Sequence, residues 1–287
     1  MKVAIMTDTN SGITKSIAES LGIFLIHMPI IIGDETFYEN DTITNEEYFS
    51  ALESDKKITT SQPSPGDVLD MWDSIFEKGY DQIVYIPMSS GLSNSYSASA
   101  SYSAEYNGSV QVVDNHRISV TLRESVFMAH ELAIQGMSAK EIKTYLEEDA
   151  YNSSIYIAVN TLDYLKKGGR ITPAAAMIGT VLSIKPILTI QGEKLDSYKK
   201  IRGSMKKALP IMLTALSNDI ESRFKQQDQT HLHIGLAGAN LSQEEIDFYL
   251  DMVRQQFSSS DIYYNPLSAS ISCHTGPGAL GIGISYR

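Results

Sequence analysis

The stretch IVYIPMSSGLSNS, residues 83–95, indicates the fold class of this 287-residue chain. Its first four residues, Ile83–Ile86, form an apolar run that is typical of a buried strand. A loop, PMSSGLSNS, follows at residues 87–95, and the small residues SYSASASYS at residues 95–103 fit a helix packed closely on a neighbour. A strand that runs through a short loop into a helix is the first part of a βαβ unit, so this stretch predicts a parallel sheet covered by helices.

Further strands and helices alternate through the first half of the chain. Short apolar runs at Val3–Met6 and Val110–Val113 predict two more buried strands. Residues 14–21 predict a helix, and Ile23–Ile32 predicts one long strand after it. We therefore expect residues 1–150 to form one α/β domain with a mainly parallel sheet and helices.

Four segments carry the capping-box pattern, in which a hydroxyl and a carboxylate three residues apart satisfy free N–H groups at a helix start. Each is followed by a helical pattern. They are Thr44–Glu47, Ser64–Asp67, Ser138–Glu141 and Ser242–Glu245. At the second of these, Pro65 falls at the first helical position, where its missing N–H costs nothing.

The second half of the chain has a different order of predicted strands and helices. After a polar break at residues 151–154, a strand is expected at Ile155–Val159. Two apolar runs, Ile187–Ile190 and Leu195–Tyr198, flank Gln191-Gly192 and predict a hairpin. The remaining expected elements are helices at residues 204–224 and 242–257 and strands at residues 233–237, 262–264 and 279–285. The pattern predicts a second α/β domain, residues 151–287, with a mixed sheet and helices.

Composition and charge exclude several classes of protein. The 23 basic and 34 acidic side chains give a net charge of −11, which argues against a nucleic-acid partner. The single cysteine, Cys273, allows neither an intramolecular disulfide nor a cysteine-based zinc site, and this fits a reducing compartment such as the cytoplasm. The N-terminal apolar run is too short for a signal peptide, and Ile23–Ile32 is too short to span a bilayer.

The common catalytic motifs are missing from the sequence. There is no phosphate-binding loop, no H-E-x-x-H zinc motif and no G-x-S-x-G nucleophile elbow. One G-x-G-x-x-G match, Gly276–Gly281, lies only six residues from the end of the printed sequence. Since a dinucleotide-binding glycine loop needs a following helix, these residues are better explained as a turn before a last strand.

Two hydroxyl-rich loops are the main candidates for a binding site: TSQPSPGD at residues 60–67, and PMSSGLSNS at residues 87–95. The second follows a strand, at the edge of a parallel sheet where ligands usually bind and where helix N-termini attract anions. Hydroxyls there could hold a carboxylate or phosphate without adding charge. A structural interpretation stays open, because Ser and Thr are also favoured helix caps.

Three basic residues stand in glycine-rich contexts. Arg170 follows two glycines in YLKKGGRI, where Gly168 is expected to cap a helix. Arg202 precedes a glycine in KKIRG, and His274 precedes the turn in CHTGPG. Each could face an anion, and His274 could be a titratable group in an otherwise neutral site. A capped helix end, a solvated strand end and a structural histidine are the alternatives.

Taken together and in order, these motifs resemble the DegV family of bacterial fatty-acid-binding proteins. The resemblance spans the chain from MTDTNSG through TSQPSPGD, SSGLSNS, LDYLKKGGRI and KKIRG to HTGPGALGIGI. It implies two α/β domains with one long-chain fatty acid held between them. It also implies that a separate fatty acid kinase receives the fatty acid and makes an acyl phosphate.

Matched residue by residue, the resemblance implies that Thr60 and Ser93 hold the carboxylate of the fatty acid. Ser61 and the loop of Ser89, Ser90 and Gly91 would line the same mouth. Arg170, Arg202 and His274 match basic positions near the head group. The sequence departs from the common G-L-S-G-T pattern at Asn94-Ser95, a difference that bears on the ligand preference rather than on the ligand class.

The resemblance thus implies a non-catalytic carrier with an apolar tunnel and without a cofactor or metal. We expect tunnel walls to include Met28, Met177, Ile178, Val181, Leu182 and Ile184. The alternative is a stand-alone acyl or phosphoryl transferase that uses His274 and Arg170. The negative charge and the lack of a basic amphipathic helix disfavour stable membrane binding but are compatible with transient membrane contact.

Overall fold

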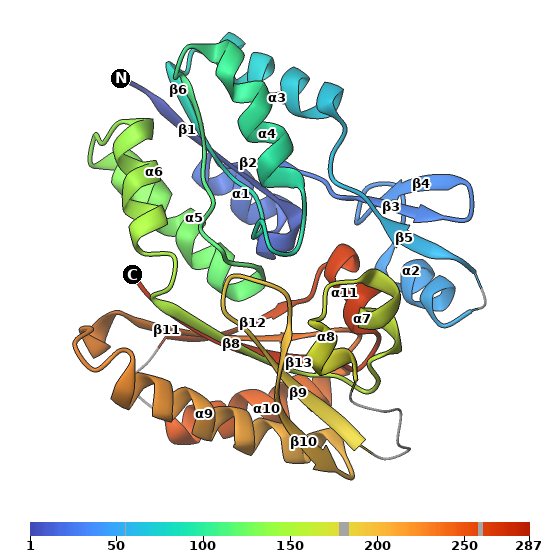
Figure 1. The fold of residues 1–287 in the computed structure, drawn as a ribbon. Coiled ribbons are helices and arrows are strands. Elements are labelled where there is room, and N and C mark those ends of the chain that lie inside the picture. Colours follow the sequence, from blue (N-terminus) through green and yellow to red (C-terminus); the bar gives the residue numbers. More distant parts are fainter. Residues whose placement is uncertain (55, 178–183, 258–260) are drawn as a thin grey trace.

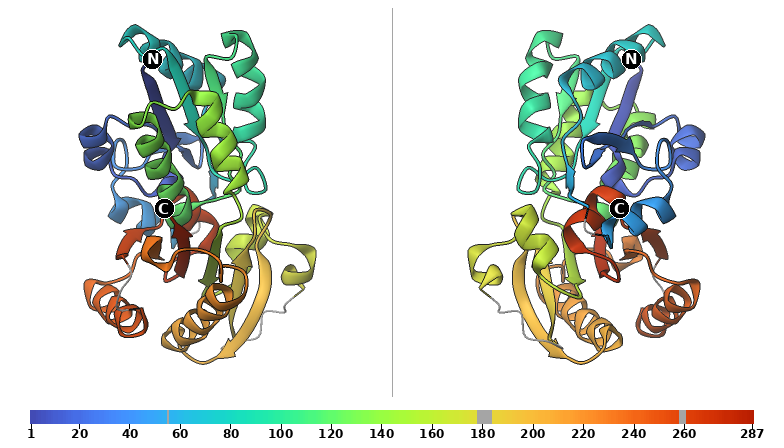
Figure 2. Two further views of the ribbon diagram at one scale, coloured as in Figure 1. Left: turned by 90° about the vertical axis from the view of Figure 1, so that its left-hand side faces the viewer. Right: turned by 90° about the vertical axis from the view of Figure 1, so that its right-hand side faces the viewer.

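The computed structural model describes residues 1–54, 56–177, 184–257 and 261–287. Within these residues the strands form three sheets. The two larger sheets lie one above the other in Figure 1, and helix α5 (Ser119–Ile134) lies between them, in contact with strands of both. Figure 2 shows the same two layers from either side. This arrangement confirms the predicted α/β class with a parallel and a mixed sheet.

The upper sheet is parallel, with the strand order β2-β1-β6-β7. Its central strands are almost wholly buried, as their apolar runs predict. The bounds are β1 Val3–Asp8, β2 Phe24–Ile26, β6 Gln82–Ile86 and β7 Val110–Val112. The predicted strands at residues 3–6, 83–86 and 110–113 are therefore confirmed.

The single long strand predicted at Ile23–Ile32 is wrong. The chain forms β2 in the parallel sheet and then β3 (Pro29–Ile32) in another sheet. The break falls at His27 and Met28, where the Met28 N–H donates to Thr9 Oγ1 at 3.2 Å instead of to a neighbouring strand. The proline at 29 adds to this, because a residue before proline is sterically restricted.

A small antiparallel sheet, absent from the sequence-based expectation, follows this break. Its order is β4-β3-β5, with β4 at Glu35–Tyr38 and β5 at Ile58–Thr60. Figure 1 shows it beside helix α2 (Asn45–Leu52), at the right of the molecule. The small sheet positions a predicted site residue, because its strand β5 ends at Thr60.

The lower sheet is mixed and has the order β10-β9-β8-β13-β11-β12 in the described residues. The predicted hairpin is present as β9 and β10, which pair antiparallel around Gly192. The pairing of β11 with β12 is parallel, and β13 is antiparallel to both of its neighbours. The bounds are β8 Ser153–Ala158, β9 Ile184–Ile190, β10 Asp196–Arg202, β11 Leu232–Gly238, β12 Asp261–Pro266 and β13 Leu280–Tyr286.

The four predicted capping boxes are all formed, each with its two reciprocal hydrogen bonds. They start helices α2, α3, α6 and α10. The helix predicted at residues 204–224 is a short 3₁₀ turn at Met205–Lys207 followed by α9. The remaining bounds are α1 Lys15–Leu21, α3 Pro65–Glu77, α4 Ser95–Ser103, α6 Ala139–Glu148, α7 Asp163–Gly168, α8 Pro173–Ala176, α9 Ala208–Ser222, α10 Gln243–Gln256 and α11 Ala269–Thr275.

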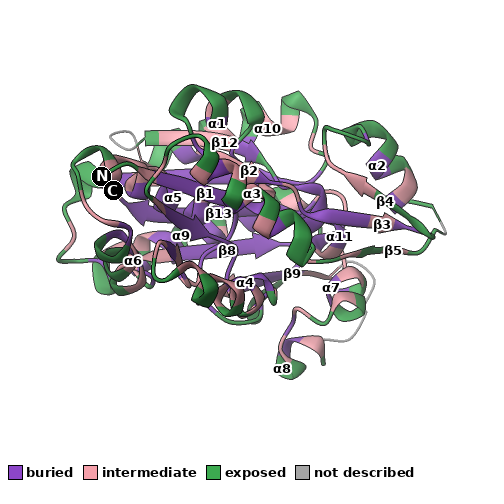
Figure 3. Cartoon of the chain, turned by 90° about the horizontal axis from the view of Figure 1, so that it is seen from above, coloured by how far each residue is buried: buried purple, intermediate pink, exposed green. Residues whose placement is uncertain are grey.

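The central strands of the mixed sheet are buried on both faces, because alternate side chains enter two different cores, whereas the edge strand β10 is mostly exposed. On β8, Ile155 and Ile157 point to the core shared with α5, whereas Tyr156 and Ala158 point to the core beneath α9 and α10. Figure 3 shows strands β1, β8 and β13 buried and the outer sides of the helices exposed. None of the helices in the described ranges has the length and apolar character needed to cross a membrane.

The division into domains at residues 150 and 151 stays a prediction. The polar segment at residues 151–154 lies at the junction of α6 and β8. The mixed sheet is built only from strands that follow α6. However, α5 belongs to the first half of the chain and packs against β1 above and against β11 and β13 below. One hydrophobic core therefore joins the two halves.

Candidate functional site: a cavity between the two sheets

A cavity lies where α5 begins, between the carboxyl ends of strands in the parallel sheet and one face of the mixed sheet. The space between its lining atoms, its opening to solvent included, is about 810 Å³. The mixed sheet contributes Ile155, Ile157, Ile190, Ala237, Gly281 and Ile282. The other apolar lining residues are Met28, Met88, Leu92, Ile118, Val120, Leu165, Leu195, Leu267 and Ile271.

Five of the predicted site residues line this one cavity, although they come from four distant parts of the chain. They are Thr60, Ser61, Ser93, Arg170 and His274. The other polar lining residues are Gln62, Ser119, Ser270 and Thr275. The cavity is therefore largely apolar, and hydroxyls, an imidazole and a guanidinium make up most of its polar lining.

Thr60 and His274 form the central polar contact of the cavity. Thr60 Oγ1 lies 2.9 Å from His274 Nε2, so a hydrogen bond joins the end of β5 to helix α11. Burial and the nearby Arg170 charge lower the pKa of His274 to about 4. The imidazole is therefore neutral at pH 7, with one ring nitrogen as a donor and the other as an acceptor.

Ser93 lies two residues before α4, and its hydroxyl is paired with that of Ser95, the first residue of the helix. The two hydroxyl oxygens are 2.9 Å apart, and the Ser95 N–H donates to Ser93 Oγ at 3.2 Å. When the Ser95 hydroxyl also donates to Ser93, the Ser93 hydroxyl proton is free to point elsewhere. Ser95, which stands at the departure from the common family pattern, thus supports Ser93 with its own hydroxyl.

Arg170 reaches the cavity from the turn after α7. Its Nε donates to Leu92 O at 3.2 Å, and a terminal nitrogen donates to Gly168 O. The helix ends one residue later than predicted, because Gly169 rather than Gly168 is the left-handed cap, with φ of 68°. Gly168 has a different role: an added Cβ there would lie 2.1 Å from His274 Nδ1, so only glycine leaves room for the imidazole.

Four predicted supporting residues, Ser89, Ser90, Gly91 and Arg202, do not line the cavity in the described structure. Ser90 lies in the loop, and its N–H donates to Asp114 Oδ1 at 3.3 Å. Gly91 packs on the β9–β10 hairpin, where an added Cβ would lie 2.6 Å from Gly192 O. Arg202 is exposed at the end of β10. Close backbone packing, rather than approach to a ligand, therefore accounts for the glycine at position 91.

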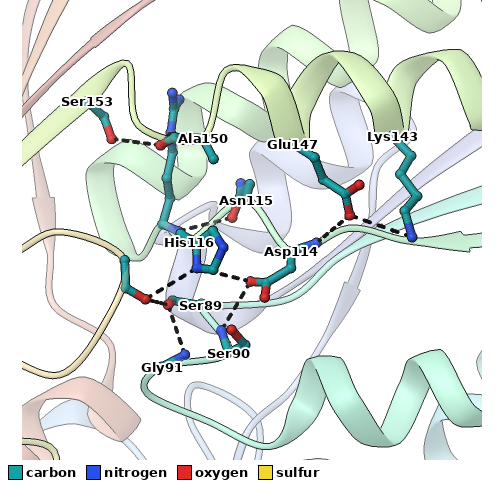
Figure 4. Close-up of polar contacts among 12 residues, drawn as sticks. Ser89, Ser90, Gly91, Asp114, Asn115, His116, Lys143, Glu147, Ala150 and Ser153 are labelled. Atoms are coloured by element: carbon teal, nitrogen blue, oxygen red, sulfur yellow. Dashed lines mark hydrogen bonds and ion pairs between the residues drawn. The ribbon is translucent and has the colours of Figure 1, made fainter.

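The tip of the β9–β10 hairpin closes one side of the cavity by binding the serine loop. Ser89 Oγ donates to Gly192 O at 2.7 Å and accepts from the Gly91 N–H at 3.2 Å. His116 Nδ1 lies 3.4 Å from the same Gly192 oxygen. Figure 4 shows Ser89, Gly91 and His116 gathered at this junction. The contact joins two segments that are about a hundred residues apart in the chain.

The predicted tunnel walls are only partly observed. Met28 lines the cavity, as expected. Met177 does not, because it follows α8 at the surface and is 85% exposed. Ile184 begins β9 and is not among the lining residues of the described structure. Ile178, Val181 and Leu182 lie outside the described residues.

Sequence reasoning predicted His274 but missed the other lining residues of helix α11 and those at the start of α5. Ser270, Ile271, His274 and Thr275 all come from α11, whose first turn is capped by the Ser268 hydroxyl. A serine at the N-cap position, Ser268, is a weak sequence signal that could have indicated the start of this helix. No group of three or more His, Cys, Asp or Glu side chains in the described residues is placed to hold a metal ion.

The fold and the cavity together define a class: two-layered α/β proteins that enclose a mostly apolar cavity between a parallel and a mixed sheet. The family follows from a comparison with known sequences. The model of the DegV family, a family described as uncharacterised, matches residues 2–287. The chain therefore belongs to the DegV family.

Curated relatives and solved structures are similar over nearly the whole chain. A DegV domain-containing protein of Streptomyces coelicolor is 30% identical and covers 99% of both chains. The structure described as fatty acid binding of a DegV family protein from Thermus thermophilus has a TM-score of 0.86 at 26% identity, with 100% of both chains covered. DegV from Bacillus subtilis, described as a fatty acid binding protein, gives the same TM-score, identity and coverage.

Proposed function

We propose that this protein binds one long-chain fatty acid, with the acyl chain in the cavity and the carboxylate at Thr60 and Ser93. The observation that carries the proposal is the composition of the cavity: branched apolar side chains and methionines line most of it, and its polar lining is mainly hydroxyls, one of them bonded to a neutral imidazole. This division matches an amphipathic molecule with a long apolar tail.

The polar groups are suited to a carboxylate. With the neutral His274 protonated on Nε2, the imidazole donates to Thr60 Oγ1, and the Thr60 hydroxyl is then free to donate to a ligand oxygen. Ser95 supports Ser93 in the same way. Arg170 supplies the positive charge that offsets a buried carboxylate, which would otherwise be costly to remove from water.

The apolar part of the cavity supplies the driving force. Burying ~15 methylenes at ~0.8 kcal/mol each gives a gross gain of about 12 kcal/mol before the costs of association. Met28 and Met88 have flexible side chains that can adapt to different conformations of an acyl chain. The relatives from Thermus thermophilus and Bacillus subtilis, which are described as fatty acid binding, support the same ligand class for this chain.

Mass spectrometry tests this proposal directly. Protein purified gently from cells should carry one acyl species by native mass spectrometry, and denaturing extraction should release a free fatty acid. Delipidated protein should take up hexadecanoic or octadecenoic acid at one molecule per chain. Protein that neither carries a fatty acid nor takes up an added one would contradict the proposed function.

We further propose a non-catalytic carrier in the cytoplasm that presents the fatty acid to a separate fatty acid kinase. The buried, unpaired thiol of Cys273 suits a reducing compartment. Basic side chains gather in the sequence around Arg170 and the β9–β10 hairpin, although the chain as a whole is acidic. They are Lys166, Lys167, Lys185, Lys194, Lys199, Lys200, Arg202, Lys206 and Lys207. This local charge favours docking of an acidic partner surface.

Turnover of ATP separates a carrier from a stand-alone transferase. The isolated chain loaded with hexadecanoic acid should not consume ATP, and consumption should begin when a bacterial fatty acid kinase is added. Acyl phosphate formation by the chain alone would favour the transferase and would contradict the carrier.

A further inference from the structure

The floor of the cavity, where the mixed sheet faces α5, is made of very small residues. On β13, Gly281 and Gly283 alternate with Leu280, Ile282 and Ile284, which pack in the opposite core under α9 and α10. On β11, Gly235 and Ala237 alternate in the same way with Ile234 and Leu236. On this part of the sheet, the neighbouring strands β11 and β13 thus have bulky side chains on one face and almost none on the other.

The register places these small residues side by side. Gly283 lies opposite Gly235, and Gly281 lies opposite Ala237. On the other side of β13, Ile155 and Ile157 of β8 stand beside the two glycines and form a wall. The result is a trough on the sheet whose floor is close to the backbone.

Helix α5 fills one half of the trough. A Cβ added at Gly235 would lie 2.4 Å from Val120 Cβ, and one added at Gly283 would lie 2.9 Å from Val120 Cγ2. These two glycines therefore allow the start of α5 to pack on the sheet. Close helix packing accounts for them without any ligand.

The other half of the trough, at Gly281, is open to the cavity. A Cβ added there would meet its nearest atoms, Ile157 Cγ1 and Tyr156 O, at 3.7 Å, which is ordinary contact distance. Gly281 and Ala237 both line the cavity. Ile282 also lines it although its side chain packs in the opposite core, which places its backbone at the cavity wall. Among the residues that the structure describes, no neighbouring side chain therefore needs the glycine at position 281.

We propose that Gly281, with Ala237 beside it, is a specificity-determining residue that keeps the floor open for a long acyl chain. This inference rests on the proposed fatty-acid function. A side chain at position 281 would project into the space that the tail occupies. It would exclude long tails, whereas shorter tails that end before this point would still fit.

Substitution at position 281 tests the proposal. Gly281→Val adds a β-branched side chain that suits a strand, and Gly281→Ala adds one methyl group. The dissociation constants of hexadecanoic and decanoic acid are measured for each variant and for the wild type. Gly66→Ala is the control, because Gly66 is the second residue of α3, is not among the residues that line the cavity, and an added Cβ there meets only Ser64 Oγ at 3.8 Å.

In Gly281→Val, the hexadecanoate dissociation constant should rise about tenfold or more relative to that of decanoate, with a smaller rise in Gly281→Ala and none in Gly66→Ala. Melting temperatures show whether each variant is folded, and Gly281→Ala decides the question if the valine variant does not fold. An unchanged ratio in folded variants would overturn the inference, as would an equal loss of both acids. Failure of the wild type to bind either acid would instead contradict the proposed function.

Discussion

Thr60 is the residue on which the proposed head-group site depends most. It ends an edge strand of the small sheet, and its hydroxyl meets an imidazole 214 positions further along the chain. The neighbouring Thr59 has an exposed side chain on the other face of the same strand. The two threonines therefore separate the effect of the cavity hydroxyl from the effect of a threonine in this strand.

Thr60→Val should weaken binding of hexadecanoic acid about tenfold, because it removes one charge-assisted hydrogen bond of roughly 1.5 kcal/mol while keeping the side-chain shape. Isothermal titration with delipidated protein measures this. The matched variant Thr59→Val should bind as the wild type does. Equal affinities of all three proteins would remove Thr60 from the site.

His274 should make folding stability depend on pH. Its pKa is lowered to about 4 in the folded protein from 6.5, mainly by burial and further by the Arg170 charge. Between these values the unfolded chain binds a proton that the folded chain does not. The free energy of unfolding should therefore fall as the pH drops from about 6.5 to about 4, and the contribution is fully present above pH 6.5.

Urea unfolding of the wild type and of His274→Gln at pH 5 and pH 7 isolates this contribution. Asp8 acts in the opposite direction, because burial raises its pKa to about 6, but it is present in both proteins. The loss of stability on going to pH 5 should be smaller in the variant. The same loss in both proteins would show that the imidazole titrates normally.

Single residues were predictable where a local motif determines them. Thr60, Ser93, Arg170 and His274 stand in short motifs, and the cavity does contain them. The roles of Gly91 and Gly168 depend on segments that are distant in sequence, the hairpin tip and helix α11. A local sequence motif includes the glycine but not the distant residue whose close packing makes glycine necessary.

At the scale of elements, the β9–β10 hairpin holds the serine loop in place. Ser89 links the loop to Gly192, and its carbonyl accepts from the N–H groups of Leu92 and Ser93. Leu195, which follows the tip, lines the cavity and donates its N–H to Arg170 O. The hairpin thereby fixes both the serine loop and the arginine turn.

Ser89→Ala should lower the free energy of unfolding by about 1–2 kcal/mol, because the Gly192 carbonyl loses a donor and the Gly91 N–H loses an acceptor. It should also speed release of hexadecanoic acid. Chemical denaturation and stopped-flow release measure the two effects. Ser90→Ala is the control, since only the backbone of Ser90 makes a hydrogen bond among the described residues. Indistinguishable variants would contradict this role of the hairpin.

Elements were predictable where the signals that form them are contiguous. All four capping boxes and the hairpin turn lie within a few residues, and each forms as expected. The small sheet was missed because β5 pairs with β3, although β4 and α2 lie between them in the sequence. No local sequence pattern indicates that pairing. Helix α11 was missed because its sequence is short and ends in the conspicuous Gly-Pro-Gly turn.

At the scale of the whole molecule, the cavity forms because a single helix, α5, separates the parallel sheet from the mixed sheet and fills only part of the space between them. Helix α5 packs on the mixed sheet at Gly235 and Gly283 and leaves the neighbouring part of that sheet uncovered. Strand patterns predicted both sheets, but the cavity depends on how side chains from the two halves fail to fill the space between them. The hydroxyl-rich loops indicated a site for a carboxylate or phosphate, and only the resemblance to a family indicated a long apolar tail behind it.

A crystal structure of the delipidated protein with added hexadecanoic acid tests the central claim most directly. We predict one acid molecule in the cavity, with its carboxylate within about 3.2 Å of Thr60 Oγ1 and Ser93 Oγ and its tail passing over Gly281. An acid bound elsewhere on the chain, or one whose carboxylate lies away from both hydroxyls, would contradict the account.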